Sequence, residues 1–119
     1  MDSLKLAYAA AQALDSKKGI DIQILKVEDL TTLADYFVLA SGNSNTQVRA
    51  LADEVEDTVE KLGLPIPRRE GRGGDTWILL DIDSVIVHVF TKESRDFYQL
   101  EKLWGDAQIV PMPDNEEKE

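Results

Sequence analysis

The chain has 119 residues and no cysteine, with 43% hydrophobic and 30% charged residues, so it fits one globular domain and excludes disulfides and thiolate zinc sites. Its 23 acidic and 13 basic residues leave a net charge of −10, which disfavours direct binding to nucleic acid and favours a basic protein partner. No segment has the roughly 20 apolar residues of a membrane span, and a cytoplasmic protein is expected.

Apolar periodicity predicts the first half of the fold. Residues 4–14 are apolar at the helical period, and Ser3 is a candidate N-cap. Residues 19–27 alternate between isoleucine and polar residues, which predicts a half-exposed strand. The apolar run Tyr36–Ala40 predicts a buried strand, and a second amphipathic helix starts at residues 43–45 and ends before a glycine and a proline.

The second half begins with a loop at residues 64–76 that is rich in proline and glycine and holds a short edge strand at 66–70. A hairpin follows, and Thr91 or Ser94 then caps a last helix that extends to Trp104. Within this helix the apolar spacing predicts a core role for three residues, Phe97, Leu100 and Leu103.

These elements predict an α+β fold with a mixed β-sheet of four to five strands and helices packed mainly on one face. The domain is expected to cover residues 1–108. Residues 109–119 are expected to form a Pro-containing, acidic C-terminal tail that is disordered.

The hairpin WILLDIDSVIVHVF, Trp77–Phe90, is the most informative segment. If Asp81 pairs with Ser84 across a two-residue turn, alternation places an aliphatic set on one face. The other face mixes apolar residues with the only histidine of the chain: Trp77, Leu79, Ile86, His88 and Phe90. No predicted helix clearly covers this second face, and aromatic residues with a polar group are typical of interface centres.

Asp81 and Asp83 admit a catalytic alternative. They are candidate Mg²⁺ ligands of a nucleotidyl transferase or phosphohydrolase, with residues 41–44 as its phosphate loop. Turn chemistry explains the aspartates more simply, and residues 41–44 lack the lysine and glycines of a P-loop. His88, without a second histidine or a cysteine, is a poor metal site, so no metal ligand or catalytic residue is predicted.

Three segments, Asp29–Val55, Trp77–Phe90 and Phe97–Ala107, resemble the ribosomal silencing factors of the RsfS (Iojap) family. The resemblance implies a nucleotidyltransferase-like core without catalytic residues, and hence no enzyme, cofactor or small-molecule substrate. It also implies binding to the large ribosomal subunit through ribosomal protein L-fourteen. Steric blocking of the small subunit then represses translation when nutrients are short, and the family is also linked to large-subunit biogenesis.

Nine partner-binding residues are expected: Trp77, Leu79, Ile86, His88, Phe90, Glu70, Asp75, Tyr98 and Glu101. The free protein is expected to be a homodimer, since a large exposed apolar patch favours association. A marginal contact with ribosomal RNA is left open for three arginines, Arg68, Arg69 and Arg72. One departure concerns the hairpin turn, where the family has Asp-x-Gly-Asp and this chain has Asp81-Ile82-Asp83-Ser84, because glycine suits a positive φ better than aspartate does.

Overall fold

A computed structural model describes residues 2–72 and 75–112 of the chain. In chain order its elements are α1 (Ser3–Ser16), β1 (Ile20–Lys26), β2 (Tyr36–Gly42), α2 (Asn45–Lys61), β3 (Arg68–Arg72), β4 (Trp77–Ile82), β5 (Val85–Thr91), α3 (Lys92–Tyr98), α4 (Leu100–Leu103) and β6 (Gln108–Val110). The strands form one sheet in the order β3-β4-β5-β2-β1-β6, in which only β2 and β5 are parallel among the described pairs. The predicted mixed α+β fold is therefore confirmed, with six strands in the described part instead of four to five.

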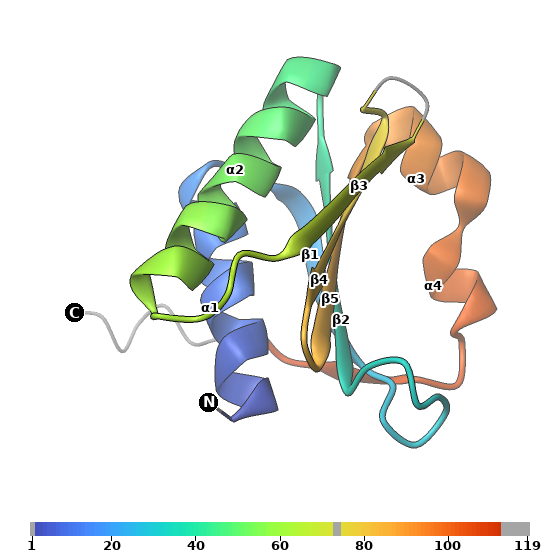
Figure 1. Cartoon of the computed structure of the whole chain (residues 1–119). Coiled ribbons are helices and arrows are strands. Elements are labelled where there is room, and N and C mark those ends of the chain that lie inside the picture. The colour runs from blue at the N-terminus through green and yellow to red at the C-terminus, as the bar shows by residue number, and fades with distance from the viewer. Residues whose placement is uncertain (1, 73–74, 113–119) are drawn as a thin grey trace.

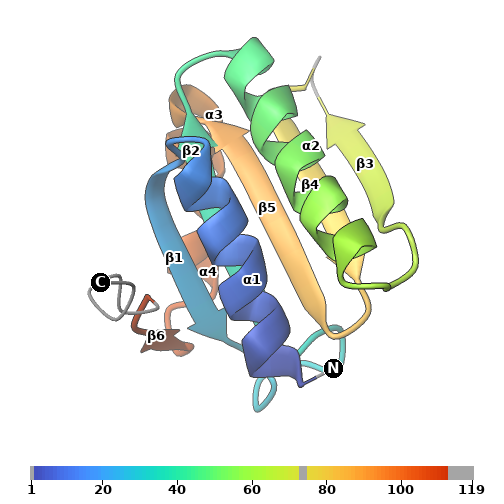
Figure 2. The same ribbon diagram turned by 90° about the vertical axis from the view of Figure 1, so that its left-hand side faces the viewer.

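The main core lies between α1, α2 and one face of the sheet (Figure 2). The periodic residues of both helices point into it, and Leu14, Val48, Leu51 and Val55 are fully buried. Each such side chain contributes roughly 1.5–3 kcal/mol through removal of apolar surface from water. The sheet supplies the facing layer from alternate residues of the hairpin, as the predicted aliphatic set requires.

The start of α1 differs from the prediction. Asp2, not Ser3, is the N-cap, and its side chain accepts a hydrogen bond from the backbone N–H of Leu4. The hydroxyl of Ser3 instead donates to Asp35 Oδ2 at 2.8 Å and lies 2.7 Å from the hydroxyl of Ser84. Ser3 therefore ties α1 to two loops at the end of the sheet, a contact that no local capping rule predicts.

The second sheet face is partly covered, contrary to expectation. Figure 1 shows α3 and α4 on the side of the sheet opposite α1 and α2. Together with this face they enclose a second, smaller cluster that includes Phe37, Leu39, Phe90 and Leu100. The chain thus has three layers, with two long helices on one side and two short ones on the other.

The last predicted helix is broken in two. Gln99 has the left-handed backbone conformation, with φ of +50°, and separates α3 from α4. Leu100 is buried after this break, whereas Phe97 and Leu103 face outward, with 80% and 76% exposure. The predicted core role is therefore confirmed for Leu100 and wrong for the other two.

The sixth strand explains the difference in strand number. β6 pairs antiparallel with the end of β1, Leu25 opposite Ile109 and Ile24 opposite Val110. Ile109 and Val110 of β6 were predicted to belong to the C-terminal tail. Residues 113–119 of that tail lie outside the described residues. Among the described helices none is both long and apolar enough to cross a membrane.

Candidate functional site

The hairpin register differs from the predicted one by two residues. Ile82 pairs with Val85, so the two-residue turn is Asp83-Ser84 instead of Ile82-Asp83. A shift of two residues preserves the face of every side chain. The mixed face predicted for the hairpin is consequently correct, while Trp77 lies opposite Phe90 and Leu79 lies opposite His88.

Burial divides this mixed face into a support and a surface. Phe90 is fully buried and His88 is 5% exposed, so neither is accessible to a partner in this structure. Trp77, Leu79 and Ile86 are half-buried. Phe90 and His88 therefore lie beneath a surface that Trp77, Leu79 and Ile86 help to form.

His88 holds Trp77 through a side-chain hydrogen bond. The indole Nε1–H of Trp77 donates to Nδ1 of His88 at 3.2 Å. The imidazole also packs edge-on against Phe37 at 5.1 Å and stacks on Phe90 at 6.0 Å. Burial lowers the pKa of His88 from 6.5 to about 4, so the ring is neutral at pH 7. Its Nε2 atom is buried and has no hydrogen-bond partner among the described residues.

Aromatic residues extend the surface from the sheet onto α3. The ring of Tyr98 lies 4.7 Å from that of Trp77, and Phe97 lies 5.0 Å beyond Tyr98. Tyr98 is 48% exposed and Phe97 is 80% exposed. We call the continuous set Trp77, Leu79, Ile86, Phe97 and Tyr98 the aromatic face. Phe97 was missed because its three-residue spacing from Leu100 assigned it to the core, a spacing that holds only if the helix continues through Gln99.

The three acidic residues predicted to bind a partner differ in their surroundings. Glu70 is exposed on β3, opposite Leu79 of the aromatic face. Asp75 accepts a hydrogen bond from Arg49 at 3.2 Å, and Glu101 pairs with Arg95 at 2.7 Å. Only Glu70 of the three is exposed and without an ion pair in the described part of the chain.

Arg95 anchors α3 and α4 to the sheet. Its guanidinium is almost buried, and it donates to Glu101 Oε2 at 2.7 Å and to Ser41 Oγ at 3.0 Å. An open cleft of about 590 Å³ lies around it, lined by acidic and basic side chains in equal number. The Arg95 guanidinium in this cleft is already hydrogen-bonded and charge-paired, so it is not free to bind an anionic ligand.

The structure separates the two halves of the catalytic alternative. Ser41 and Gly42 end β2 beside Phe90 and Thr91, whereas Asp81 and Asp83 lie at the other end of the hairpin. Five residues of strand, about 17 Å, lie between these ends of the sheet. Within residues 2–72 and 75–112, no three histidine or acidic side chains are grouped to hold a metal ion. The geometry therefore gives Asp81 and Asp83 no phosphate loop to act with.

Asp83 has a φ of +54° at this turn, a left-handed conformation in which glycine would be favourable. Ser84 follows it, and its backbone carbonyl accepts from the N–H of Asp35 at 2.7 Å. Its hydroxyl lies 2.7 Å from that of Ser3, so Ser84 is used here for an internal contact.

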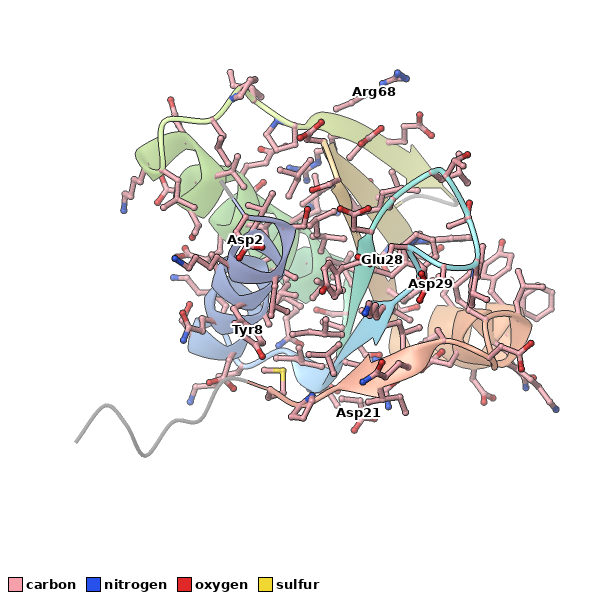
Figure 3. All side chains as sticks on the ribbon, turned by 90° about the horizontal axis from the view of Figure 1, so that it is seen from below. Asp2, Tyr8, Asp21, Glu28, Asp29 and Arg68 are labelled. Carbon is pink, nitrogen blue, oxygen red and sulfur yellow. The ribbon has the colours of Figure 1, made fainter. Side chains whose placement is uncertain are left out.

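The three arginines considered for a contact with RNA, Arg68, Arg69 and Arg72, differ in their surroundings. Arg69 points toward α2 and pairs with Asp53 at 2.7 Å and Glu56 at 3.3 Å. Arg68 points away from the sheet edge into solvent, as seen in Figure 3. The side chain of Arg72 lies outside the described part.

Comparisons with known proteins agree on one family. A family model described as "Ribosomal silencing factor during starvation" matches residues 1–119. The ribosomal silencing factor RsfS of Bacillus subtilis is 40% identical over 112 residues, covering 94% of this chain and 95% of that protein. The chloroplast protein Iojap of Zea mays is 30% identical, covering 94% of this chain and 49% of its own length.

A mouse relative and a crystal structure extend the comparison. The mouse protein named "Mitochondrial assembly of ribosomal large subunit protein 1" is 32% identical over 94 residues, with 76% of this chain and 41% of that protein covered. A crystal structure of a protein from Chromobacterium violaceum superposes with a TM-score of 0.85 at 36% identity, covering 97% of this chain and 95% of that one. The described fold is thus shared with experimentally determined relatives.

Proposed function

We propose a function for this chain, which belongs to the RsfS family of ribosomal silencing factors. It binds the large ribosomal subunit and blocks joining of the small one. Its direct partner is ribosomal protein L-fourteen, and its effect is to repress translation in the cytoplasm when nutrients are short. The action is occupancy, without a chemical step.

The observation that carries this proposal is the aromatic face. Trp77 and Tyr98 combine large apolar rings with polar groups, the composition that dominates binding energy at the centre of protein interfaces. The Trp77 indole is held from below by His88, so little side-chain entropy is lost when a partner covers it. Such a face is suited to a complementary apolar patch on a protein.

Charge supports a protein partner on the ribosome. With a net charge of −10, the chain is repelled by exposed phosphate groups and attracted to basic protein surfaces. Exposed Glu70 lies beside Leu79 at the edge of the aromatic face. Electrostatic attraction of this kind guides association and rejects wrong partners more than it adds affinity.

The size of the domain supports steric blocking. Its principal extents are 32 × 30 × 30 Å. When two subunits are joined, their contacting atoms lie within a few ångströms of each other, the distance range of hydrogen bonds and packed atoms. A body of this size on the joining surface therefore keeps the subunits apart without any change in either.

The test uses separated ribosomal subunits. The purified chain should sediment with large subunits and not with small ones, and it should lower the number of joined particles when both are present. Trp77→Ala should weaken binding by about 2 kcal/mol, or roughly 30-fold. Leu62→Ala, which removes an exposed leucine at the end of α2, is the control and should bind as the wild type does. Equal binding by both variants would refute the role of the aromatic face.

Two further parts of the proposal concern assembly and the free protein. The name of the mouse relative refers to assembly of the large ribosomal subunit, which supports a role for this chain in large-subunit biogenesis. In the free protein, the aromatic face pairs with a second copy, because Phe97 and Tyr98 otherwise remain in water. Sedimentation velocity tests this homodimer, which Phe97→Ser should dissociate.

A further inference from the structure

A second cleft lies at the end of the sheet where β4 begins and β5 ends. In Figure 1 the start of α2 and the helix α3 lie on opposite sides of this end of the sheet. An open cleft of about 600 Å³, which we call the α2–α3 cleft, is lined by residues of both helices and of the strand ends, among them Asn45, Thr76, Thr91, Phe97 and Tyr98. Because Phe97 and Tyr98 belong to the aromatic face, the cleft continues that face beyond the open end of the hairpin.

Helix α3 divides its charged side chains between two clefts. Its two cations, Lys92 and Arg95, line the cleft around Arg95, whereas Glu93 lines the α2–α3 cleft and is exposed. Within residues 2–72 and 75–112, Glu93 is the only charged side chain of that lining and forms no ion pair. Arg49 on α2 is paired with Asp75. The α2–α3 cleft therefore holds one carboxylate that no cation of the described chain neutralises.

The carboxylate lies one helical turn from an exposed aromatic ring. Glu93 and Phe97 are four residues apart in α3, a spacing that places their Cβ atoms about 5–6 Å from each other on one side of a helix. Phe97 is 80% exposed, so its ring has a face open to solvent. The face of an aromatic ring attracts a cation. A cationic group that lies on Phe97 is therefore within reach of the Glu93 carboxylate.

The composition of the cleft favours arginine over lysine as that cation. Thr76 and Thr91 supply hydroxyl groups, which accept hydrogen bonds as well as donate them. A guanidinium carries five N–H donors in one plane, so it can stack on an aromatic ring while it donates to a carboxylate at its edge. A lysine ammonium is more strongly hydrated and has no plane to stack. The ring, the carboxylate and the hydroxyl groups together thus match a guanidinium.

We propose that the α2–α3 cleft receives an arginine side chain from the basic protein that binds the aromatic face, a proposal that rests on the function given above. The guanidinium stacks on Phe97 and pairs with the carboxylate of Glu93. A basic protein is the favoured source of this arginine, because the chain has a net charge of −10. A second copy carries the same negative charge and is a poorer source, and an RNA phosphate is repelled by Glu93.

The experiment measures binding of the full chain to purified large ribosomal subunits over a range of salt, at chain concentrations at which sedimentation velocity shows a monomer. Glu93→Gln removes the charge of the cleft. Glu60→Gln is the matched control, because it makes the same change in net charge at an exposed residue of α2, on the other side of the sheet. The Glu93 variant should bind about fivefold more weakly than the control at about 0.05 M salt. This gap should close toward about 0.5 M, where the Debye length is roughly threefold shorter.

A second substitution tests the ring. Phe97→Leu keeps an apolar side chain but removes the aromatic face, and it should weaken binding about threefold. If Glu93 and Phe97 hold the same guanidinium, the double variant should lose less affinity than the product of the two single losses, because each interaction helps to position the group for the other. A loss equal to that product would refute the shared guanidinium.

The outcomes separate this inference from the function on which it rests. If Trp77→Ala weakens binding but Glu93→Gln equals its control at low salt, the cleft inference is wrong and the docking role stands. Full binding by Trp77→Ala would overturn both. Tighter binding by Glu93→Gln than by its control would identify an anionic occupant, such as an RNA phosphate, and refute the proposal. Weaker self-association of Glu93→Gln with unchanged subunit binding would identify a second copy as the occupant and refute it as well. Urea unfolding of each variant confirms that it is folded.

Discussion

His88→Leu should make the protein more stable while removing its only histidine. The wild-type imidazole is 5% exposed, and its Nε2 is buried without a partner among the described residues. A buried unsatisfied polar group costs about 1–3 kcal/mol, whereas the lost hydrogen bond from the Trp77 indole is worth about 0.5–1.5 kcal/mol. The expected result at pH 7 is a gain of about 1 kcal/mol in the free energy of unfolding.

The same substitution should change the dependence of stability on pH. Because the pKa of His88 falls from 6.5 to about 4 on folding, the unfolded chain binds a proton that the folded chain excludes. Stability is therefore unaffected by this group above pH 6.5 and is lost as the pH falls from 6.5 to 4. At pH 5 the loss is about 2 kcal/mol, and the leucine variant should not suffer it.

Urea unfolding of both proteins at pH 7 and pH 5, followed by tryptophan fluorescence, measures the two free energies. The advantage of the variant should grow from about 1 kcal/mol to about 3 kcal/mol between these conditions. Other titrating groups act on both proteins and cancel in the difference. An advantage that stays constant with pH would show that the imidazole is not buried in its neutral form, and the account of its environment given above would be wrong.

Two other substitutions test the turn and the α3–α4 anchor. Asp83→Gly should raise the free energy of unfolding by up to about 1 kcal/mol, since glycine adopts the +54° φ of this residue without strain, and a lower urea midpoint would contradict the turn geometry. Arg95→Met should lower the free energy of unfolding by about 3 kcal/mol, because it leaves Glu101 without its partner and Ser41 without its donor. Amide exchange should accelerate in α3 and α4 but not in α1, and uniform exchange in both regions would refute the anchor.

The faces of the hairpin could be predicted from sequence because alternation is a local property. Ile78 and Leu80 were assigned to the core and Trp77 and Leu79 to the other face, and the structure agrees. The register was not predictable in the same way. Two-residue turns at Ile82-Asp83 and at Asp83-Ser84 give identical faces, so the hydrophobic pattern does not distinguish them.

The break at Gln99 had no local signal, because neither glycine nor proline marks it. It is fixed by distant contacts: Arg95 reaches Ser41, which lies 54 residues earlier in the chain. β6 likewise depends on a partner, β1, that is remote in sequence. Local propensity does not contain these pairings, and they decide which aromatic residues are buried.

The short length of α3 and α4 is what gives this sheet a docking surface. Two long helices on this side would bury the whole hairpin face, as α1 and α2 do on the other side. Instead Arg95 and Leu100 hold the short helices over Phe37 and Phe90, and Trp77 and Leu79 remain half-exposed beside them. Phe97, in the last turn of α3, faces away from the core. The two short helices thus both close the second core and extend the surface that we propose for ribosome binding.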